Sequence, residues 1–64
     1  MNIFKRARLT QGLTQAQLAA KLGVSTVSVW QWEKGVTLPK VSRLAEVAAV
    51  LGTTVPELLD GREQ

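Results

Sequence analysis

The side chains best placed to do chemistry lie on one face of the segment from Ser25 to Lys34. If successive residues turn by about 100°, as in a helix, Val29 and Trp32 point to one side. The opposite face carries a hydroxyl, an amide, a cation and two apolar groups, from Thr26, Gln31, Lys34, Val27 and Trp30. No acid accompanies them, which is unusual for a face that meets only water. The pattern predicts contact with a partner surface.

The residue types in this sequence give little support to a catalytic function. The chain has no histidine and no cysteine, so imidazole and thiolate chemistry are excluded and a zinc site is implausible. It has no paired carboxylates, no nucleophile with a base, and no phosphate loop of the form G-x-x-x-x-G-K-[ST]. We therefore expect a protein that is not an enzyme and that uses neither a metal nor a cofactor.

Charge is distributed unevenly along the chain. Residues 1–43 hold one acid, Glu33, and seven basic residues: Lys5, Arg6, Arg8, Lys21, Lys34, Lys40 and Arg43. Residues 44–64 hold one basic residue, Arg62, and four acids: Glu46, Glu57, Asp60 and Glu63. A positive end and a negative end favour an oriented approach to a polyanion. The plainer alternative is a charged surface that only keeps the protein in solution.

Length and composition indicate one globular domain over residues 1–64. With 64 residues and no cysteine to cross-link it, the chain is near the size at which a single core is only just sufficient. Its content of 45% hydrophobic and 20% charged residues is typical of globular proteins. Gly, Lys or Thr interrupt its longest apolar stretches, so we expect no membrane span, no signal peptide and a cytoplasmic location.

Glycine and capping residues predict an all-α chain. A glycine follows each periodic stretch, as left-handed helix caps do, at Gly12, Gly23, Gly35, Gly52 and Gly61. Helix starts are indicated by Thr14 with Gln17, by Ser25, and by Thr54 with Glu57. No run alternates with period two, so no strand is expected. The predicted helices cover residues 2–11, 15–22, 26–34, 41–51 and 55–60.

The third and fourth helices are joined by a linker that contains Pro39. Because proline disfavours a helical conformation in the residue before it, Leu38 is expected to be extended and to anchor the linker in the core. The other core candidates are apolar residues at helical spacing: Phe4, Leu13, Leu18, Leu22, Val24, Val29, Trp32, Leu44, Val47, Ala48, Leu51, Val55, Leu58 and Leu59.

Residues 15–34 resemble the helix-turn-helix of the lambda-repressor-like family, also called the Cro/C1 or XRE family. Gln15 opens the unit, Ala19 is the small residue where two helices cross, and Gly23 occupies the turn. The buried positions of the motif are filled by Leu18, Leu22, Val24, Val29 and Trp32. E-K-G, a proline, A-x-x-L-G and P-E-L-L follow in the family's order. The resemblance spans the chain and implies a compact five-helix domain with the helix-turn-helix at the second and third helices.

Family geometry implies that the helix over residues 26–34 enters the major groove of DNA, with Thr26, Val27 and Gln31 nearest the bases. A glutamine can bond adenine through N6 and N7, a threonine can donate or accept, and a valine can touch the thymine methyl group. A half-site containing A·T pairs is therefore expected. The resemblance also implies a structural ion pair, partly buried, between Arg8 and Glu33.

Contacts to the DNA backbone are implied around that helix. Gln15 stands at the positive end of the preceding helix, where a phosphate is favoured. The further candidates are Ser25, Ser28, Trp30, Lys34, Lys40 and Arg43. Trp30 has three open roles, which are a sugar–phosphate contact, cover for the stem of Lys34, and contact with another protein.

The function implied by the resemblance is sequence-specific regulation of transcription on double-stranded DNA. The chain is expected to be a repressor that binds a palindromic operator as a homodimer. We expect this dimer to be weak in the absence of DNA, and we expect no small-molecule ligand. Dimer contacts are expected at Val55, Pro56 and Leu58. The alternative is an antitoxin-like or coactivator-like interaction module with the same fold, which Trp30 and the non-basic residues 36–38 keep open.

Overall fold

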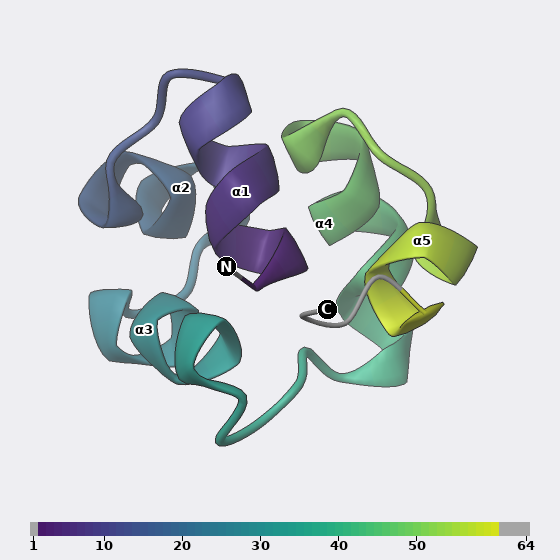
Figure 1. Cartoon of the computed structure of the whole chain (residues 1–64). Coiled ribbons are helices and arrows are strands. Elements are labelled where there is room, and N and C mark those ends of the chain that lie inside the picture. Colours follow the sequence, from purple (N-terminus) through teal and green to yellow (C-terminus); the bar gives the residue numbers. More distant parts are fainter. Residues whose placement is uncertain (1, 61–64) are drawn as a thin grey trace.

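Residues 2–60 are described by a computed structural model, and five α-helices and one 3-10 turn account for most of them (Figure 1). The elements are α1 (Ile3–Thr10), α2 (Gln15–Leu22), α3 (Thr26–Lys34), η1 (Val41–Arg43), α4 (Leu44–Leu51) and α5 (Val55–Asp60). No strand occurs in this part of the chain. The prediction of an all-α, five-helix domain is confirmed.

Short polar side chains begin α1, α2 and α3, because they satisfy backbone N–H groups that the first turn leaves free. Asn2 Oδ1 accepts from the backbone N–H of Phe4 at 2.6 Å. At α2, Thr14 Oγ1 accepts from Gln17 N while Gln17 Oε1 accepts from Thr14 N, which completes the predicted capping box. Ser25 Oγ accepts from Ser28 N at the start of α3. These caps are local in sequence, which is why the helix starts were predictable.

Three helix ends differ from the predicted ones. Gln11, predicted as helical, is the C-cap of α1, and Asn2 is its N-cap, so α1 is one residue shorter at each end. The predicted helix over 41–51 begins as the 3-10 turn η1, because Arg43 has φ −104° and ψ −8° and no side chain caps the first turn. Gly23 ends α2 with φ 67°, a left-handed conformation that glycine adopts readily. Gly61, the predicted end of α5, lies outside the described residues.

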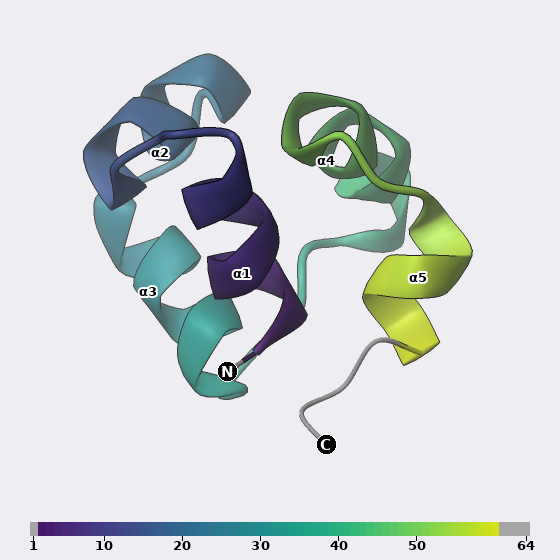
Figure 2. The ribbon, with the colours of Figure 1, turned by 45° about the horizontal axis from the view of Figure 1, so that its top comes forward.

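One core holds the helices together. Figures 1 and 2 show α1 between the pair α2 and α3 on one side and the pair α4 and α5 on the other. Phe4 of α1 and Trp32 of α3 meet inside, with ring centroids 6.1 Å apart and planes tilted by 44°. The other buried apolar residues are Ala7, Leu18, Ala19, Leu22, Val29, Leu44, Val47, Ala48, Leu51 and Leu58.

Two predicted core residues are exposed. Leu38 is 60% exposed, and the buried residue of the linker is Pro39. Adjacent residues of an extended segment point to opposite sides, so burying the proline ring turns Leu38 outward. Leu59 is 45% exposed, because Leu58 takes the core position of α5 and the next residue is turned about 100° away. Leu13, Val24 and Val55 pack at the edge of the core and are only partly buried.

The helices are short. Among residues 2–60, none is both long enough and apolar enough to cross a membrane.

Candidate nucleic-acid interface

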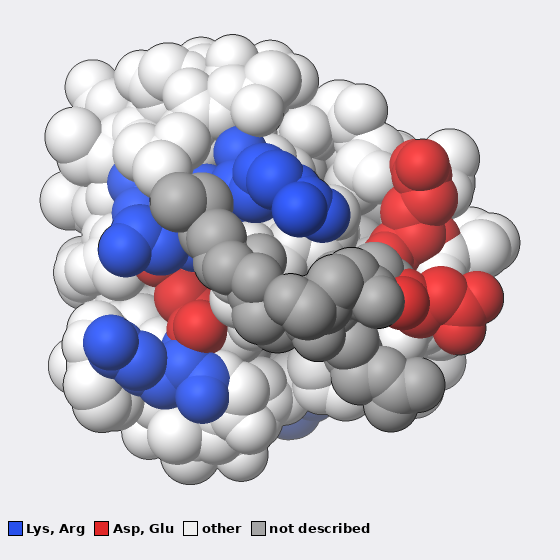
Figure 3. Space-filling view, in the orientation of Figure 1, with Lys and Arg blue, Asp and Glu red and all other residues white. Residues whose placement is uncertain are grey.

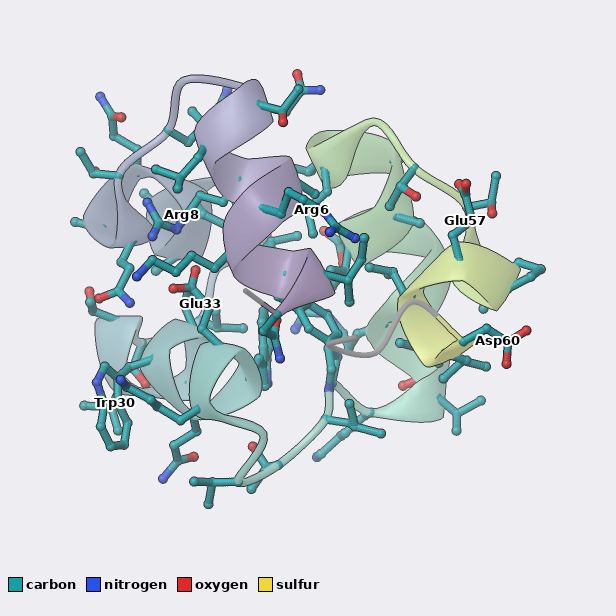
Figure 4. All side chains as sticks on the ribbon, in the orientation of Figure 1. Arg6, Arg8, Trp30, Glu33, Glu57 and Asp60 are labelled. Atoms are coloured by element: carbon teal, nitrogen blue, oxygen red, sulfur yellow. The ribbon has the colours of Figure 1, made fainter. Side chains whose placement is uncertain are left out.

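The two faces of α3 are separated as the sequence predicts. Val29 and Trp32 are buried in the core, with exposed fractions of 0% and 5%. On the other side, Val27 is 62% exposed and Trp30 points away from the molecule (Figure 4). Thr26 and Lys34 are also exposed, whereas Gln31 is half-buried. A helix fixed along one side therefore presents its polar and apolar outer face as a ridge.

The N-terminal end of α3 is held by its own hydroxyl groups. Ser25 Oγ caps the helix by accepting from Ser28 N at 3.1 Å, and the two hydroxyl oxygens are also 3.1 Å apart. Ser28 is half-buried and Ser25 is exposed. Both residues are predicted to contact the DNA backbone. In the structure they are hydrogen-bonded to each other at the rim of the ridge.

The C-terminal end of α3 is tied to α1 by two polar contacts. Asn2 Nδ2 donates to the backbone oxygen of Trp32 at 3.1 Å. Arg8 Nε lies 2.5 Å from Glu33 Oε2, and Arg8 Nη2 donates to Glu33 Oε1 at 3.2 Å. Figure 4 shows these two side chains pointing toward one another from α1 and α3. The pair is buried, with its side chains only 9% and 3% exposed, and so it fixes the angle of α3 to the rest of the domain.

The same carboxylate also holds the first residue of α2. Gln15 Nε2 donates to Glu33 Oε1 at 3.1 Å, and Gln15 is half-buried. Arg8 Nη1 donates to the backbone oxygen of Leu13 at 2.8 Å, in the turn before α2. The link from Gln15 to Glu33 was not predicted, because no local pattern relates a helix start to an acid at the end of the next helix. Gln15 therefore has a fixed intramolecular partner at the place where a phosphate contact was predicted.

Trp30 and Lys34 lie one turn apart on the ridge. The ammonium of Lys34 is 6.0 Å from the centre of the Trp30 ring, at the outer limit for attraction between a cation and an aromatic face. The indole thus lies near the cation at the C-terminal end of α3, and the three roles of Trp30 stay predictions.

A groove of about 480 Å³ runs between α3 and the linker, and Ser28, Lys40 and Arg43 are among the residues that line it. Lys40 is exposed. The guanidinium of Arg43, however, donates to the backbone oxygen of Leu22 at the end of α2 and to Glu46 Oε1 at 3.0 Å. These partners occupy its Nε and one terminal nitrogen, so Arg43 joins α2 to α4, and its contact with a DNA phosphate stays a prediction.

Charge separates in space as it does along the sequence. Figure 3 shows Lys and Arg side chains gathered over α1 and α3, and Asp and Glu side chains gathered over α5. Lys5, Arg6 and Lys34 are exposed on the first side, Glu57 and Asp60 on the second. Hydroxyl groups of Thr53 and then Thr54 donate to the Glu57 carboxylate and lower its pKa. Of these cations Lys34 lies on the ridge, whereas Lys5 and Arg6 belong to α1.

The three residues predicted to contact a second copy differ in their exposure. Val55 is half-buried and Pro56 is exposed at the start of α5. Leu58 is 2% exposed and belongs to the monomer core, so its predicted contact with a second copy is incompatible with this fold. Leu59, next to it, is the exposed leucine of α5.

Comparison with known proteins agrees with this geometry. A family model described as helix-turn-helix matches residues 4–58, which reach from α1 into α5. The chain belongs to this family. It is also 36% identical over 59 residues to the HTH-type transcriptional activator BcrR of Enterococcus faecalis, a match that covers 92% of this chain and 29% of the relative. The chain thus spans less than a third of the length of that curated relative.

Membership of the helix-turn-helix family assigns the fold as lambda-repressor-like and the domain to DNA-binding transcription regulators. In this family α2 and α3 are the motif itself, and Gly23 is its turn. In helix-turn-helix proteins the second helix of the motif lies in the major groove. The family is generally not enzymatic.

Proposed function

We propose that the chain binds double-stranded DNA sequence-specifically as a homodimer, with α3 in the major groove of a palindromic operator. The observation that carries this proposal is the outer face of α3, which is exposed and free of acids on a helix whose other side is fixed in the core. A rigid helical ridge of this kind fits a groove about 12 Å wide. Membership of the helix-turn-helix family supports the same orientation.

Base contacts are assigned to Thr26, Val27 and Gln31. Val27 can give only an apolar contact, and the apolar group in the major groove is the thymine methyl. Gln31 is half-buried, so part of its side chain is already ordered before DNA arrives. Its amide N–H donates to N7 and its oxygen accepts from N6 of the same adenine, whereas guanine offers two acceptors at N7 and O6, so the bidentate pair discriminates adenine from guanine. A half-site with A·T pairs follows from these side chains.

Backbone contacts are assigned on both sides of the ridge. Gln15 and the first turn of α2 face one phosphate strand, and Lys34 and Lys40 face the other with Ser25, Ser28 and Trp30 at the rim. Such contacts fix register and orientation without reading sequence. Arg43 stays in this set, because Leu22 and Glu46 take only its Nη2 and Nε and its Nη1 can still donate to a phosphate.

Two copies are needed because one helix reads only a few base pairs. Half-sites of helix-turn-helix dimers lie about 34 Å apart, one turn of the duplex. We assign the dimer contact to Val55, Pro56 and the exposed Leu59 around the start of α5. Most apolar side chains of this small domain are used in its core, so the dimer is weak in the absence of DNA.

The proposal is tested by selecting duplexes from a random pool with the wild-type chain and with Gln31→Ala. The wild type is expected to return an inverted repeat whose half-sites contain A·T pairs, and the variant to lose preference at one position of each half-site. Gln11→Ala is the matched control, since Gln11 is an exposed glutamine at the end of α1, outside the ridge. Half-sites made only of G·C pairs, or identical preferences for all three proteins, would contradict the assignment.

For the direction of regulation we propose repression, because a compact domain seated on a promoter excludes other proteins from it. The relative BcrR is named an activator, so a promoter reporter decides between the two. Expression of the chain should lower output from a promoter that overlaps the selected sequence. An increase in output would replace repression by activation without affecting the DNA contacts.

A second candidate function is protein binding by the linker. Val36, Leu38 and Val41 are 62%, 60% and 87% exposed, and this apolar surface beside the ridge suits a protein partner. An antitoxin-like or coactivator-like module would use it. Replacing all three with serine should abolish partner capture and leave DNA selection unchanged if the linker binds protein; a loss of DNA affinity alone would discard this function.

A further inference from the structure

Glu33 does more in this structure than pair with one arginine. Its carboxylate receives three donors, which are Nε and Nη2 of Arg8 and Nε2 of Gln15. The three residues come from α3, α1 and α2, and the Glu33 side chain is only 3% exposed. A buried acid therefore connects the core to the first residue of α2.

The Gln15 amide uses only one of its two N–H groups in this network. A glutamine amide has two N–H groups, and Gln15 gives one to Glu33. At the same helix end, the capping box uses the backbone N–H groups of Thr14 and Gln17. Those of Gln15 and Ala16 have no partner among residues 2–60. One side-chain N–H and two backbone N–H groups thus remain together at the positive end of α2.

Arg8 offsets the repulsion that the Glu33 carboxylate would exert on a nearby phosphate. Glu33 is the only acid in residues 1–43, and a free carboxylate one side chain away from a phosphate would repel it. The two hydrogen bonds from Arg8 neutralise that carboxylate within the core. Gln15 is consequently anchored on a neutral pair, which can orient the amide without opposing an anion.

We infer that Glu33 is a positioning residue for DNA binding, which holds the Gln15 amide in the orientation that meets a backbone phosphate. The ion pair then has a second role besides joining α1 to α3. Because Gln15 is ordered before DNA arrives, less side-chain freedom is lost on binding. This inference rests on the proposed function, since it concerns a phosphate of the bound duplex.

The test replaces the ion pair without leaving a buried charge. In Arg8→Met with Glu33→Leu, apolar side chains fill the site, a change that other proteins often tolerate with little loss of stability. The net charge stays the same. Affinity for a selected duplex of roughly 20 base pairs, two helical turns, is measured by fluorescence anisotropy. Gln15→Leu and the triple variant complete a thermodynamic cycle, and Gln11→Leu is the control for the same substitution elsewhere.

The positioning role predicts a specific pattern of affinities. Gln15→Leu should bind about tenfold to a hundredfold more weakly for each copy on the duplex, the range for one lost hydrogen bond to a charged group. The Arg8/Glu33 double variant should bind several-fold more weakly while its circular dichroism spectrum and thermal midpoint show a folded domain. The triple variant should bind no more weakly than Gln15→Leu alone. A folded double variant that binds within twofold of the wild type, or losses that multiply in the triple variant, would overturn the inference.

A second measurement needs no variant of the ion pair. In the free wild-type chain, the Gln15 side-chain amide should be rigid by 15N relaxation, unlike that of the exposed Gln11, and should keep its orientation when duplex is added. An amide that averages freely and becomes ordered only on DNA would overturn the inference even if the double variant failed to fold. If the wild type bound no duplex at all, the proposed function itself would fail, although a rigid Gln15 amide would still show the intramolecular link.

Discussion

At the scale of single residues, Arg8 and Glu33 are the charged residues that lie buried in the described part of the domain. Removing only the acid with Glu33→Leu leaves a guanidinium buried without its partner. We expect a loss of about 3–5 kcal/mol in the free energy of unfolding, a large share of the stability of so small a domain. Urea denaturation compares this variant with the Arg8→Met, Glu33→Leu double variant, which should recover most of the loss. Equal losses in both would show that the charge is not the cause.

Trp30 gives a second test at the residue scale. Because its ring is exposed and lies near the Lys34 ammonium, Trp30→Ala should change the unfolding free energy by less than about 0.5 kcal/mol. DNA affinity should fall, because Lys34 loses the surface that restrains it. The matched control is Val41→Ala, another exposed apolar residue outside α3. A thermal midpoint lowered as far as in a core variant would contradict an outward-facing Trp30.

At the scale of elements, the turn between α2 and α3 depends on a left-handed residue. Gly23 has φ 67°, and a Cβ built there would meet nothing within 4 Å. Gly23→Ala should therefore cost only the backbone strain of about 1–2 kcal/mol, with no steric clash. Asn tolerates this conformation better, so Gly23→Asn should cost less in the same urea titration. Equal costs for both substitutions would indicate a steric cause instead.

The start of α5 responds to pH through Glu57. Hydrogen bonds from Thr53 and Thr54 lower the pKa of this carboxyl below its ordinary value of 4.5. A carboxyl with a lowered pKa in the folded state stabilises the fold above its unfolded pKa, and this stabilisation is lost as pH falls through the folded value. The thermal midpoint of Glu57→Gln should therefore lie below that of the wild type above pH 4.5 and converge with it in stronger acid. A constant difference across pH would contradict the assignment.

Elements were more predictable than contacts between them. The capping box at Thr14 and the turn at Gly23 are set by a few neighbouring residues, so the bounds of α2 and α3 follow from sequence. Leu38 was placed wrongly, because local pattern shows that the linker is extended but not which side faces the core. The link from Gln15 to Glu33 joins positions 18 residues apart and exists only once α2 and α3 are packed together.

For the whole molecule, the separation of charge sets the dependence of binding on salt. Basic side chains lie over α1 and α3 and acidic ones over α5, so the domain should approach DNA in one orientation. If the dimer neutralises about six phosphates, the logarithm of affinity should fall with the logarithm of salt concentration at a slope near −5. Lys40→Gln should reduce this slope by about two per dimer, and a flat salt response would exclude phosphate binding altogether.

The central claim is that the exposed face of α3 contacts base edges in the major groove. It is tested most directly by replacing the thymines of a selected half-site with uracil, which removes only the methyl group from that groove. Wild-type affinity should fall by about fourfold for each methyl that Val27 covers. Val27→Ala should bind the thymine and uracil duplexes with nearly equal affinity. If the wild type did not distinguish the two duplexes, or if Val27→Ala distinguished them as strongly as the wild type, the assignment of Val27 and of the face that carries it would be contradicted.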